Sequence, residues 1–267
     1  MSRGSRLAFL PFLLIALTIG LQAQNLASEQ VQVAPPGRGV PSASESAEQL
    51  EKTADLLRAK KSYLDALDFY LAAIAKAPNN PRLYNKAGIV ELEVQRYREA
   101  SKDFTHAIKA DRKFADAYNN LGVVDYLEKK TNRALKQYKK AIQINGSSAS
   151  FYSNLGAAYF SRKEFEAATV AYAKALQLDP EIFEHTSING VSGRISSPQD
   201  RAHYDYVLAG LYAKSGNNTR SLEYLRRAME EGYKGVEDAY KDPEFAALRA
   251  DPRFAALMAS HPTVIPE

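Results

Sequence analysis

Small, apolar and aromatic residues recur along the middle of the chain at intervals that fit helices. Tyr118, Gly122 and Asp125 follow the i, i+4, i+7 spacing of one helical face, and the segment from Ala134 to Ala141 repeats that spacing. The pattern predicts two helices packed face to face. Where their backbones cross we expect small residues, with Gly122 on the first helix close to Ala134 on the second.

The same helix pair recurs four times without an insertion. Gly88, Gly122 and Gly156 stand 34 residues apart, and Ala54 holds the equivalent place before them. Each later pair carries an alanine, an aromatic residue and a second alanine at fixed offsets: Ala100, Phe104 and Ala107; Ala134, Tyr138 and Ala141; Ala168, Tyr172 and Ala175. Since one pair cannot bury its apolar face alone, the pairs are expected to stack into a solenoid.

Proline and its neighbours mark the predicted helix starts. Asn80 with Pro81 and Asp179 with Pro180 each combine a capping residue with proline at the first helical position. The pattern stops in a segment rich in Ser, Gly and Asn, which predicts a loop insertion at 183–200. A degenerate fifth pair is predicted at 201–235, and capping helices that start at Asp242–Pro243 and Asp251–Pro252 are predicted within 236–267.

The 34-residue pattern resembles the tetratricopeptide repeat family, over 46–182 without an insertion. One departure is Thr131, where the other copies have Tyr63, Tyr97 and Phe165. The resemblance implies an all-α fold: a right-handed α-solenoid of antiparallel helix pairs, closed by C-terminal capping helices. The "DP.F..L" phrase near the end also resembles the last segments of bacterial members of the family.

In that family the first helix of each pair lines a groove that holds a partner protein or peptide. Carried over position by position, the resemblance implies a row of amide and lysine side chains beside an apolar row. The candidate groove residues are Asn85, Lys86, Ile89, Leu92, Asn119, Asn120, Val123, Tyr126, Asn154, Ala157 and Phe160. We expect Tyr126 and Phe160 to be exposed anchors whose replacement by alanine weakens partner binding and leaves the fold intact.

Two interpretations of the amide row remain open. Asn120 and Asn154 resemble the asparagine ladder that grips a peptide backbone in some members, because an amide both donates and accepts. Lys52 and Lys86 hold this place in the earlier copies, so the ladder would have only two rungs. Alternatively, the amides brace neighbouring helices and bind nothing. The carboxylate clamp of chaperone-binding members is absent, since Ser150 and Asn154 replace its basic residues.

The N-terminus has the three parts of a secretory signal peptide. Arg3 and Arg6 precede an apolar run from Leu7 to Leu21, and Ala23 supplies a small residue for cleavage. We therefore expect residues 1–23 to be removed and 24–45 to be a flexible linker, leaving a periplasmic or secreted protein. An uncleaved inner-membrane anchor is the alternative, although the run is shorter than the about 20 residues that span a bilayer.

Composition favours binding over catalysis. The chain has no cysteine, its four histidines show no metal-ligand spacing, and nucleophile and phosphate-loop motifs are missing, so we expect no enzyme, cofactor or metal site. The formal charge of +4 is too low for a nucleic-acid binder. We expect a scaffold for another protein or peptide, with no small-molecule substrate and with membrane contact only through an uncleaved N-terminus. The alternative is an assembly subunit of an envelope secretion, pilus or polysaccharide machine that uses the outward face and the 181–200 loop.

Overall fold

The computed structural model describes residues 39–184 and 197–260 of the 267-residue chain. The predicted signal peptide, residues 24–38 of the predicted linker and residues 185–196 of the predicted loop lie outside these ranges. Val40–Glu267 forms a unit of its own by its internal contacts. None of the described helices is both long enough and apolar enough to cross a bilayer.

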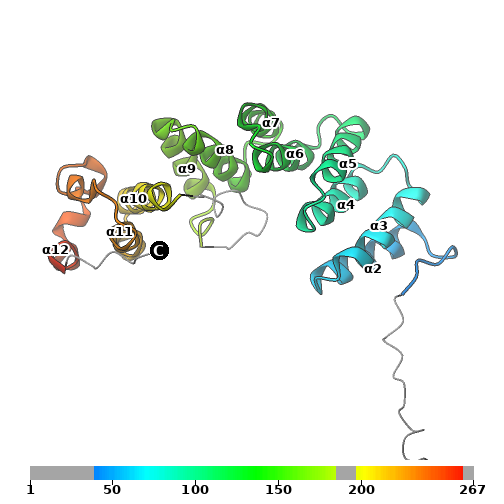
Figure 1. Cartoon of the computed structure of the whole chain (residues 1–267), viewed down its shortest axis with the longest axis horizontal. Coiled ribbons are helices and arrows are strands. Elements are labelled where there is room, and N and C mark those ends of the chain that lie inside the picture. Colours follow the sequence, from blue (N-terminus) through cyan, green and yellow to red (C-terminus); the bar gives the residue numbers. More distant parts are fainter. Residues whose placement is uncertain (1–38, 185–196, 261–267) are drawn as a thin grey trace, which may run out of the picture. The chain divides into compact units, whose positions relative to one another are not determined.

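Helices follow one another in antiparallel pairs, and the described residues contain no strand (Figure 1). The first residue and the last residue of each helix in the first four pairs recur at steps of 34. These pairs are α2 (Ala47–Ala59) with α3 (Tyr63–Lys76), α4 (Pro81–Glu93) with α5 (Tyr97–Ala110), α6 (Ala115–Leu127) with α7 (Thr131–Ile144), and α8 (Ala149–Ser161) with α9 (Phe165–Leu178). We call α2, α4, α6 and α8 first helices, and α3, α5, α7 and α9 second helices.

The chain continues with a fifth pair. Its first helix is α10 (Pro198–Lys214) and its second helix is α11 (Asn218–Glu230). Three short 3-10 helices follow, η2 (Val236–Tyr240), η3 (Pro243–Phe245) and η4 (Leu248–Ala250), and then α12 (Pro252–Ser260). The prediction of two capping helices after the Asp-Pro pairs is therefore half correct. Pro252 starts an α-helix, whereas Pro243 starts only a three-residue 3-10 helix.

Side-chain caps fix some of the helix starts. Ser46 and Gln49 form a reciprocal capping box at the start of α2. The Asn80 side chain accepts a hydrogen bond from the Arg82 amide, with Pro81 in the first turn, as the sequence predicts. The predicted start at Pro180 is wrong: Asp179 ends α9, and residues 180–184 form a turn.

Each helical glycine of the first four pairs lies against the aromatic ring of its own pair. A Cβ atom placed on Gly122 would lie 2.6 Å from the Tyr138 ring, and one on Gly156 would lie 2.5 Å from the Tyr172 ring. The side chain nearest to Gly122 is therefore that of Tyr138, one turn beyond Ala134 on α7. Glycine is needed here because the ring occupies the space that a side chain would fill.

The turns inside the pairs share one strained residue. Lys61, Gln95, Lys129 and Lys163 stand 34 residues apart, and each has a φ between 61° and 63°. Gly216 holds the same place in the fifth pair, with a φ of 81°. The left-handed conformation is unfavourable for side chains other than glycine, so four of these five turns carry a small strain.

The core is divided along the chain. One cluster of buried residues joins α2 and α3 to α4, a second joins the middle pairs, and a third runs from Phe160 and Tyr172 to Met258. In the third cluster the C-terminal segment covers α10: the Tyr206 hydroxyl donates to Asp242, and a Cβ on Gly210 would lie 3.3 Å from the Glu244 side chain. The last pair is therefore buried by the residues that follow it.

Candidate functional site

The structure brings the predicted asparagines together on neighbouring first helices. Asn154 Nδ2 donates to Asn119 Oδ1 at 3.0 Å, Asn119 Nδ2 donates to Asn120 Oδ1 at 3.1 Å, and Asn120 Nδ2 donates to Asn85 Oδ1 at 3.0 Å. The amides thus form one directed chain from α8 through α6 to α4. This arrangement agrees with the second interpretation of the amide row, in which asparagines brace neighbouring helices.

The amide chain ends in a donor at Asn85. Within the described residues, Asn85 Nδ2 donates no hydrogen bond, whereas Asn85 Oδ1 accepts one from Asn120. Asn120 is half-buried and Asn154 is 3% exposed, so Asn154 is largely withdrawn from a partner. Asn85 is 7% exposed, so a ligand in front of α4 and α6 would meet mainly the Asn120 amide and would reach only the edge of the Asn85 amide.

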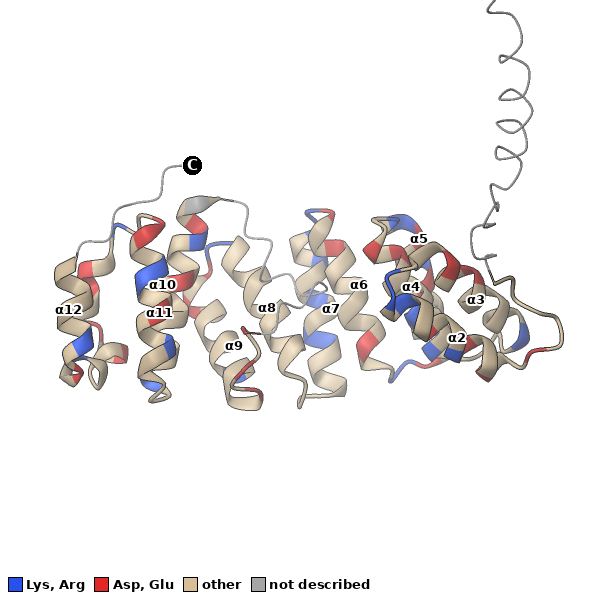
Figure 2. Cartoon of the chain, turned by 90° about the horizontal axis from the view of Figure 1, so that it is seen from below, with Lys and Arg blue, Asp and Glu red and all other residues tan. Residues whose placement is uncertain are grey.

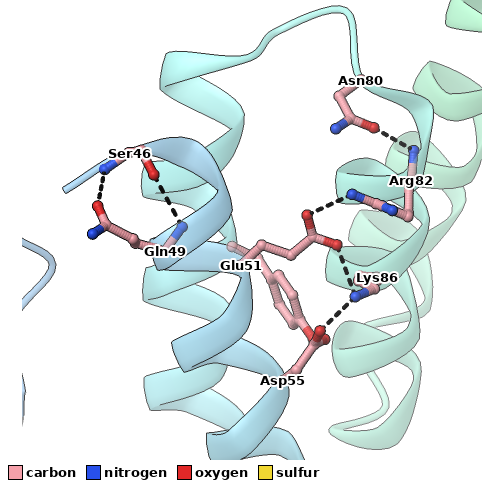
Figure 3. A network of polar contacts seen from close by, with 8 residues as sticks. Ser46, Gln49, Glu51, Asp55, Asn80, Arg82 and Lys86 are labelled. Atoms are coloured by element: carbon pink, nitrogen blue, oxygen red, sulfur yellow. Dashed lines mark hydrogen bonds and ion pairs between the residues drawn. The ribbon is translucent and has the colours of Figure 1, made fainter.

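Lys86 belongs to a charged network that joins the first two pairs (Figure 3). Its Nζ lies 2.8 Å from Glu51 Oε1 and 2.6 Å from Asp55 Oδ2, and Arg82 lies 3.0 Å from Glu51 Oε2. Burial raises the pKa of Asp55, but hydrogen bonds from Lys86 and Tyr70 outweigh it and hold this pKa below its ordinary value. The Lys86 charge is therefore already neutralised by carboxylates of α2.

Sequence reasoning did not identify Glu51 and Asp55 as neighbours of the candidate residues. The 34-residue step could have identified both residues. Glu51 stands 34 residues before Asn85, and Asp55 stands 34 residues before Ile89. The first helix of the first pair thus carries carboxylates at the places where later pairs have amide and aliphatic side chains. At α2, the face formed by the first helices therefore carries charged side chains.

Most of the predicted apolar row is buried, so the expectation that it is exposed is wrong. The exposed fractions are 6% for Leu92, 3% for Val123, 2% for Ala157 and 2% for Phe160. The Phe160 ring packs edge-on against the ring of His203, at 5.4 Å between centroids, and α10 supplies that histidine. Replacing Phe160 with alanine would open the core, so the double alanine variant would not test binding alone.

Ile89, Asn120, Tyr126 and Lys86 are the candidate residues that remain half-exposed. They lie on α4 and α6. Burial raises the pKa of the Tyr126 hydroxyl, and a hydrogen bond with Ser161 opposes that shift. The accessible part of the predicted groove is therefore shorter than the sequence indicates, and it combines one aliphatic, one aromatic, one amide and one lysine side chain, with the Asn85 amide at its buried edge.

Comparison with known families assigns the repeats. The family described as "Tetratricopeptide repeat" matches residues 149–182, and a related description, "TPR repeat", matches residues 124–163. The chain contains tetratricopeptide repeats within residues 124–182. The two matches cover α8 with α9 and the junction between the third and fourth pairs, and the first two pairs keep the same 34-residue step.

Solved structures share the tetratricopeptide fold at low identity. A MamA fragment from Desulfovibrio magneticus RS-1 is 19% identical, with a TM-score of 0.50, and the match covers 75% of this chain and all of that one. PilF of Pseudomonas aeruginosa is 17% identical, with a TM-score of 0.50, and covers 77% of this chain and 82% of that one. Among curated proteins, none matches this tetratricopeptide chain significantly.

Chemical groups that suit catalysis do not converge in the described ranges. No three His, Asp or Glu residues there are placed to hold a metal ion. Glu91 and Asp103 are acids whose pKa values are raised by burial, to about 7 and about 6, but they lie within the second tetratricopeptide pair and not on the amide face. Among the described residues, the face built from α4 and α6 presents amide and apolar side chains beside Lys86, which is paired with Glu51 and Asp55.

Proposed function

We propose that the chain is a scaffold that binds an extended segment of another protein across α4 and α6. The observation that carries this proposal is the amide chain, which passes through half-exposed Asn120 and ends in a donor at Asn85, 7% exposed, beside half-exposed Ile89 and Tyr126. An extended peptide has unpaired backbone carbonyls, and the Asn85 amide can donate to one of them. Ile89 and Tyr126 supply apolar contact on either side.

The directed amide chain also favours this assignment energetically. Each asparagine in the chain donates to the next, so the acceptor of Asn85 is already occupied and its donor is left for the partner. Chains of hydrogen bonds polarise one another, which strengthens a donor at the end of the chain. Bracing and binding are therefore two uses of the same side chains.

A matched pair of variants tests the face. We expect Ile89→Arg to abolish capture of partner proteins from an extract of the source cells, because a charge would replace the apolar contact. Val170→Arg is the control, since Val170 is a β-branched residue on the second helix α9 and is 71% exposed. Both variants should melt like the parent in circular dichroism. Unchanged capture by Ile89→Arg would remove the proposal.

The alternative is an assembly subunit of an envelope secretion, pilus or polysaccharide machine that makes its contacts through second helices. The burial of Leu92, Val123 and Phe160 favours it, because it reduces the apolar surface on the first helices. The same experiment separates the two assignments: loss of capture in Val170→Arg with normal capture in Ile89→Arg would support the assembly subunit.

We further propose that the protein is exported and works in a bacterial envelope or outside the cell. The support is the sequence of the N-terminus, with Arg3, Arg6 and the apolar run from Leu7 to Leu21, and the absence of cysteine, which lets the chain fold without an oxidant. N-terminal sequencing of the protein from fractionated cells should give a start after Ala23. An intact Met1 in the cytosolic fraction alone would overturn the proposal.

A further inference from the structure

Positive charge is concentrated in the second and third helix pairs. Residues 81–148 contain 14 Lys and Arg and eight Asp and Glu, a formal charge of +6 against +4 for the entire chain. Two of the eight acids are turned inward, since Glu91 is 7% exposed and Asp125 is 1% exposed. The outside of these pairs is therefore more basic than the residue count suggests.

Helix α7 contributes most of this charge and has no acidic residue of its own (Figure 2). Arg133 pairs with the buried Asp125, but Lys136, Lys139 and Lys140 point outward, and no described carboxylate forms an ion pair with them. Lysines three and four residues apart repel one another on a helix. Lys139 lies over the Tyr159 ring and Lys140 donates to Gln143, but neither contact neutralises a charge, so the repulsion remains.

The row continues on α5 in the same orientation. Lys102 stands 34 residues before Lys136 and occupies the same outward place, and Arg98 and Lys109 are exposed beside it. Glu99 is the one exposed acid of this helix. We define the basic row as the exposed cations of these two second helices: Arg98, Lys102, Lys109, Lys136, Lys139 and Lys140.

Exposed aliphatic side chains hold the equivalent places on the second helices before and after. Val170 on α9 stands 34 residues after Lys136 and is 71% exposed, and Leu71 on α3 stands 68 residues before Lys139 and is 47% exposed. Val170 thus takes the place of Lys136 on α9 and Leu71 takes the place of Lys139 on α3, whereas the exposed Asp68 of α3 holds the place of Lys102 and Lys136. Single exposed aliphatic residues are ordinary on a protein surface, and these two are of interest because they border the row of cations.

We propose that the basic row, flanked by Leu71 and Val170, docks on an anionic lipid surface. Lysine ammonium groups near such a surface are attracted by its phosphates, and this attraction is weakened by salt. Aliphatic side chains at the edge of a basic face can enter the boundary between headgroups and acyl chains, a contact that an acidic protein in water does not offer. This surface lies on second helices, so the inference does not depend on the proposed binding of a partner by first helices.

Vesicle binding tests the proposal. The probe is a vesicle of phosphatidylglycerol and phosphatidylcholine in equal parts, with pure phosphatidylcholine as the neutral reference. The protein is the segment Val40–Glu267, which forms a unit of its own and lacks the apolar N-terminal run; a cooperative thermal transition confirms that it is folded. We expect partition to the anionic vesicles at 50 mM salt to be at least tenfold stronger than to neutral ones, and to fall steeply with added salt.

A charge-matched control separates the row from net charge. Replacing Lys102, Lys109, Lys136 and Lys140 with glutamate should abolish binding. The same change at Lys52, Lys60, Lys234 and Lys241, which are exposed cations outside residues 81–148, should leave most of it. Equal loss in both variants, or no anionic preference in the parent segment, would overturn the proposal.

The apolar edge distinguishes a lipid surface from an acidic protein. Leu71→Ser with Val170→Ser should lower vesicle partition several-fold and leave binding to polyglutamate unchanged, because only the bilayer has an apolar interior. If the parent binds polyglutamate but not anionic vesicles, the basic row belongs to an acidic protein and the lipid proposal is wrong.

Discussion

At the residue scale, equivalent tyrosines of different pairs differ in their hydrogen bonds. The Tyr70 hydroxyl donates to Asp55 at 2.5 Å, whereas the buried hydroxyls of Tyr138 and Tyr172 have no partner among the described residues. The reason lies one helix away, because Val123 and Ala157 hold the places that correspond to Asp55. A buried hydroxyl without a partner is costly, so these two tyrosines lower the stability of the pairs that contain them.

Removing the hydroxyls should therefore have opposite effects. We expect Tyr138→Phe to stabilise the protein by about 1 kcal/mol, since it removes an unsatisfied buried group. Tyr70→Phe should destabilise it by about 1 to 2 kcal/mol, since it removes one of the two donors to Asp55 and leaves only Lys86. Urea unfolding followed by circular dichroism measures both. A loss for Tyr138→Phe as large as that for Tyr70→Phe would show that the Tyr138 hydroxyl has a partner.

The strained turn residues give a second prediction at this scale. Lys129 has a φ of 63°, so Lys129→Gly should raise the free energy of unfolding by about 0.5 to 1 kcal/mol through relief of the left-handed strain. Gly216→Ala is the inverse control. A Cβ on Gly216 would meet nothing within 4 Å, so any loss of stability there comes from the backbone alone. The prediction is wrong if thermal unfolding shows that Lys129→Gly lowers stability.

At the scale of elements, the second and third helix pairs differ in whether a buried acid on the first helix has a cation on the second helix. Asp125 on α6 is 1% exposed and pairs with Arg133 on α7 at 3.2 Å. Glu91 holds the equivalent place on α4, but Glu99 stands where Arg133 would be, and Glu91 Oε2 is buried without a hydrogen bond among the described residues. Burial, together with Asp103 and Glu99, raises the pKa of Glu91 to about 7.

This raised pKa makes stability depend on pH. Between the ordinary pKa of Glu91, 4.5, and its folded value of about 7, the folded chain binds more protons than the unfolded chain, so stability falls as the pH rises through this window. We expect the protein to be more stable at pH 5 than at pH 8. Glu91→Gln should reduce this difference in urea unfolding, because glutamine does not ionise.

Supplying the missing cation should remove much of the same dependence. Glu99→Arg places a guanidinium where Arg133 serves Asp125, and we expect a gain of about 1 kcal/mol at pH 8 with a smaller difference between pH 5 and pH 8. The matched control is Arg133→Glu, which should lower the free energy of unfolding because it leaves Asp125 buried without its cation. An unchanged pH profile in Glu99→Arg would show that Glu91 is not the responsible group.

The sequence predicted the helix pairs well because their determinants are local. Gly122 and Tyr138 lie within one pair, and Asn80 with Pro81 lies within one turn, so spacing along the chain is sufficient. The state of the candidate site depends on contacts between pairs. Phe160 is buried by α10 beyond a break in the pattern, and Lys86 is neutralised from α2. Spacing along the chain does not show which of two side chains at equivalent repeat positions will be buried by a neighbouring pair.

At the scale of the whole unit, the division of the core into separate buried clusters predicts unequal responses to truncation. Deleting residues 236–267 uncovers Gly210 and removes the Asp242 partner of Tyr206, so α10 and α11 should lose protection from hydrogen exchange. Helices α2 to α5 belong mainly to other clusters and should keep their exchange rates, because each pair in a solenoid contacts only its neighbours. Equal loss of protection in α2 and α11, measured by mass spectrometry, would show instead that the array unfolds as one cooperative unit.

The constant step between helix boundaries also determines which changes of length the chain can absorb. Removing residues 102–135, one whole step, would join the start of α5 to the end of α7 with every side chain still facing its former direction. Removing one residue fewer would turn all later positions of the fused helix by about 100° and bring lysines toward the core. The interval between the fourth and fifth pairs departs from the 34-residue step, and it is consistent with this constraint. Ala202 follows Ala149 by 53 residues, 19 more than one step, and the extra residues lie between two pairs, where they rotate no helix.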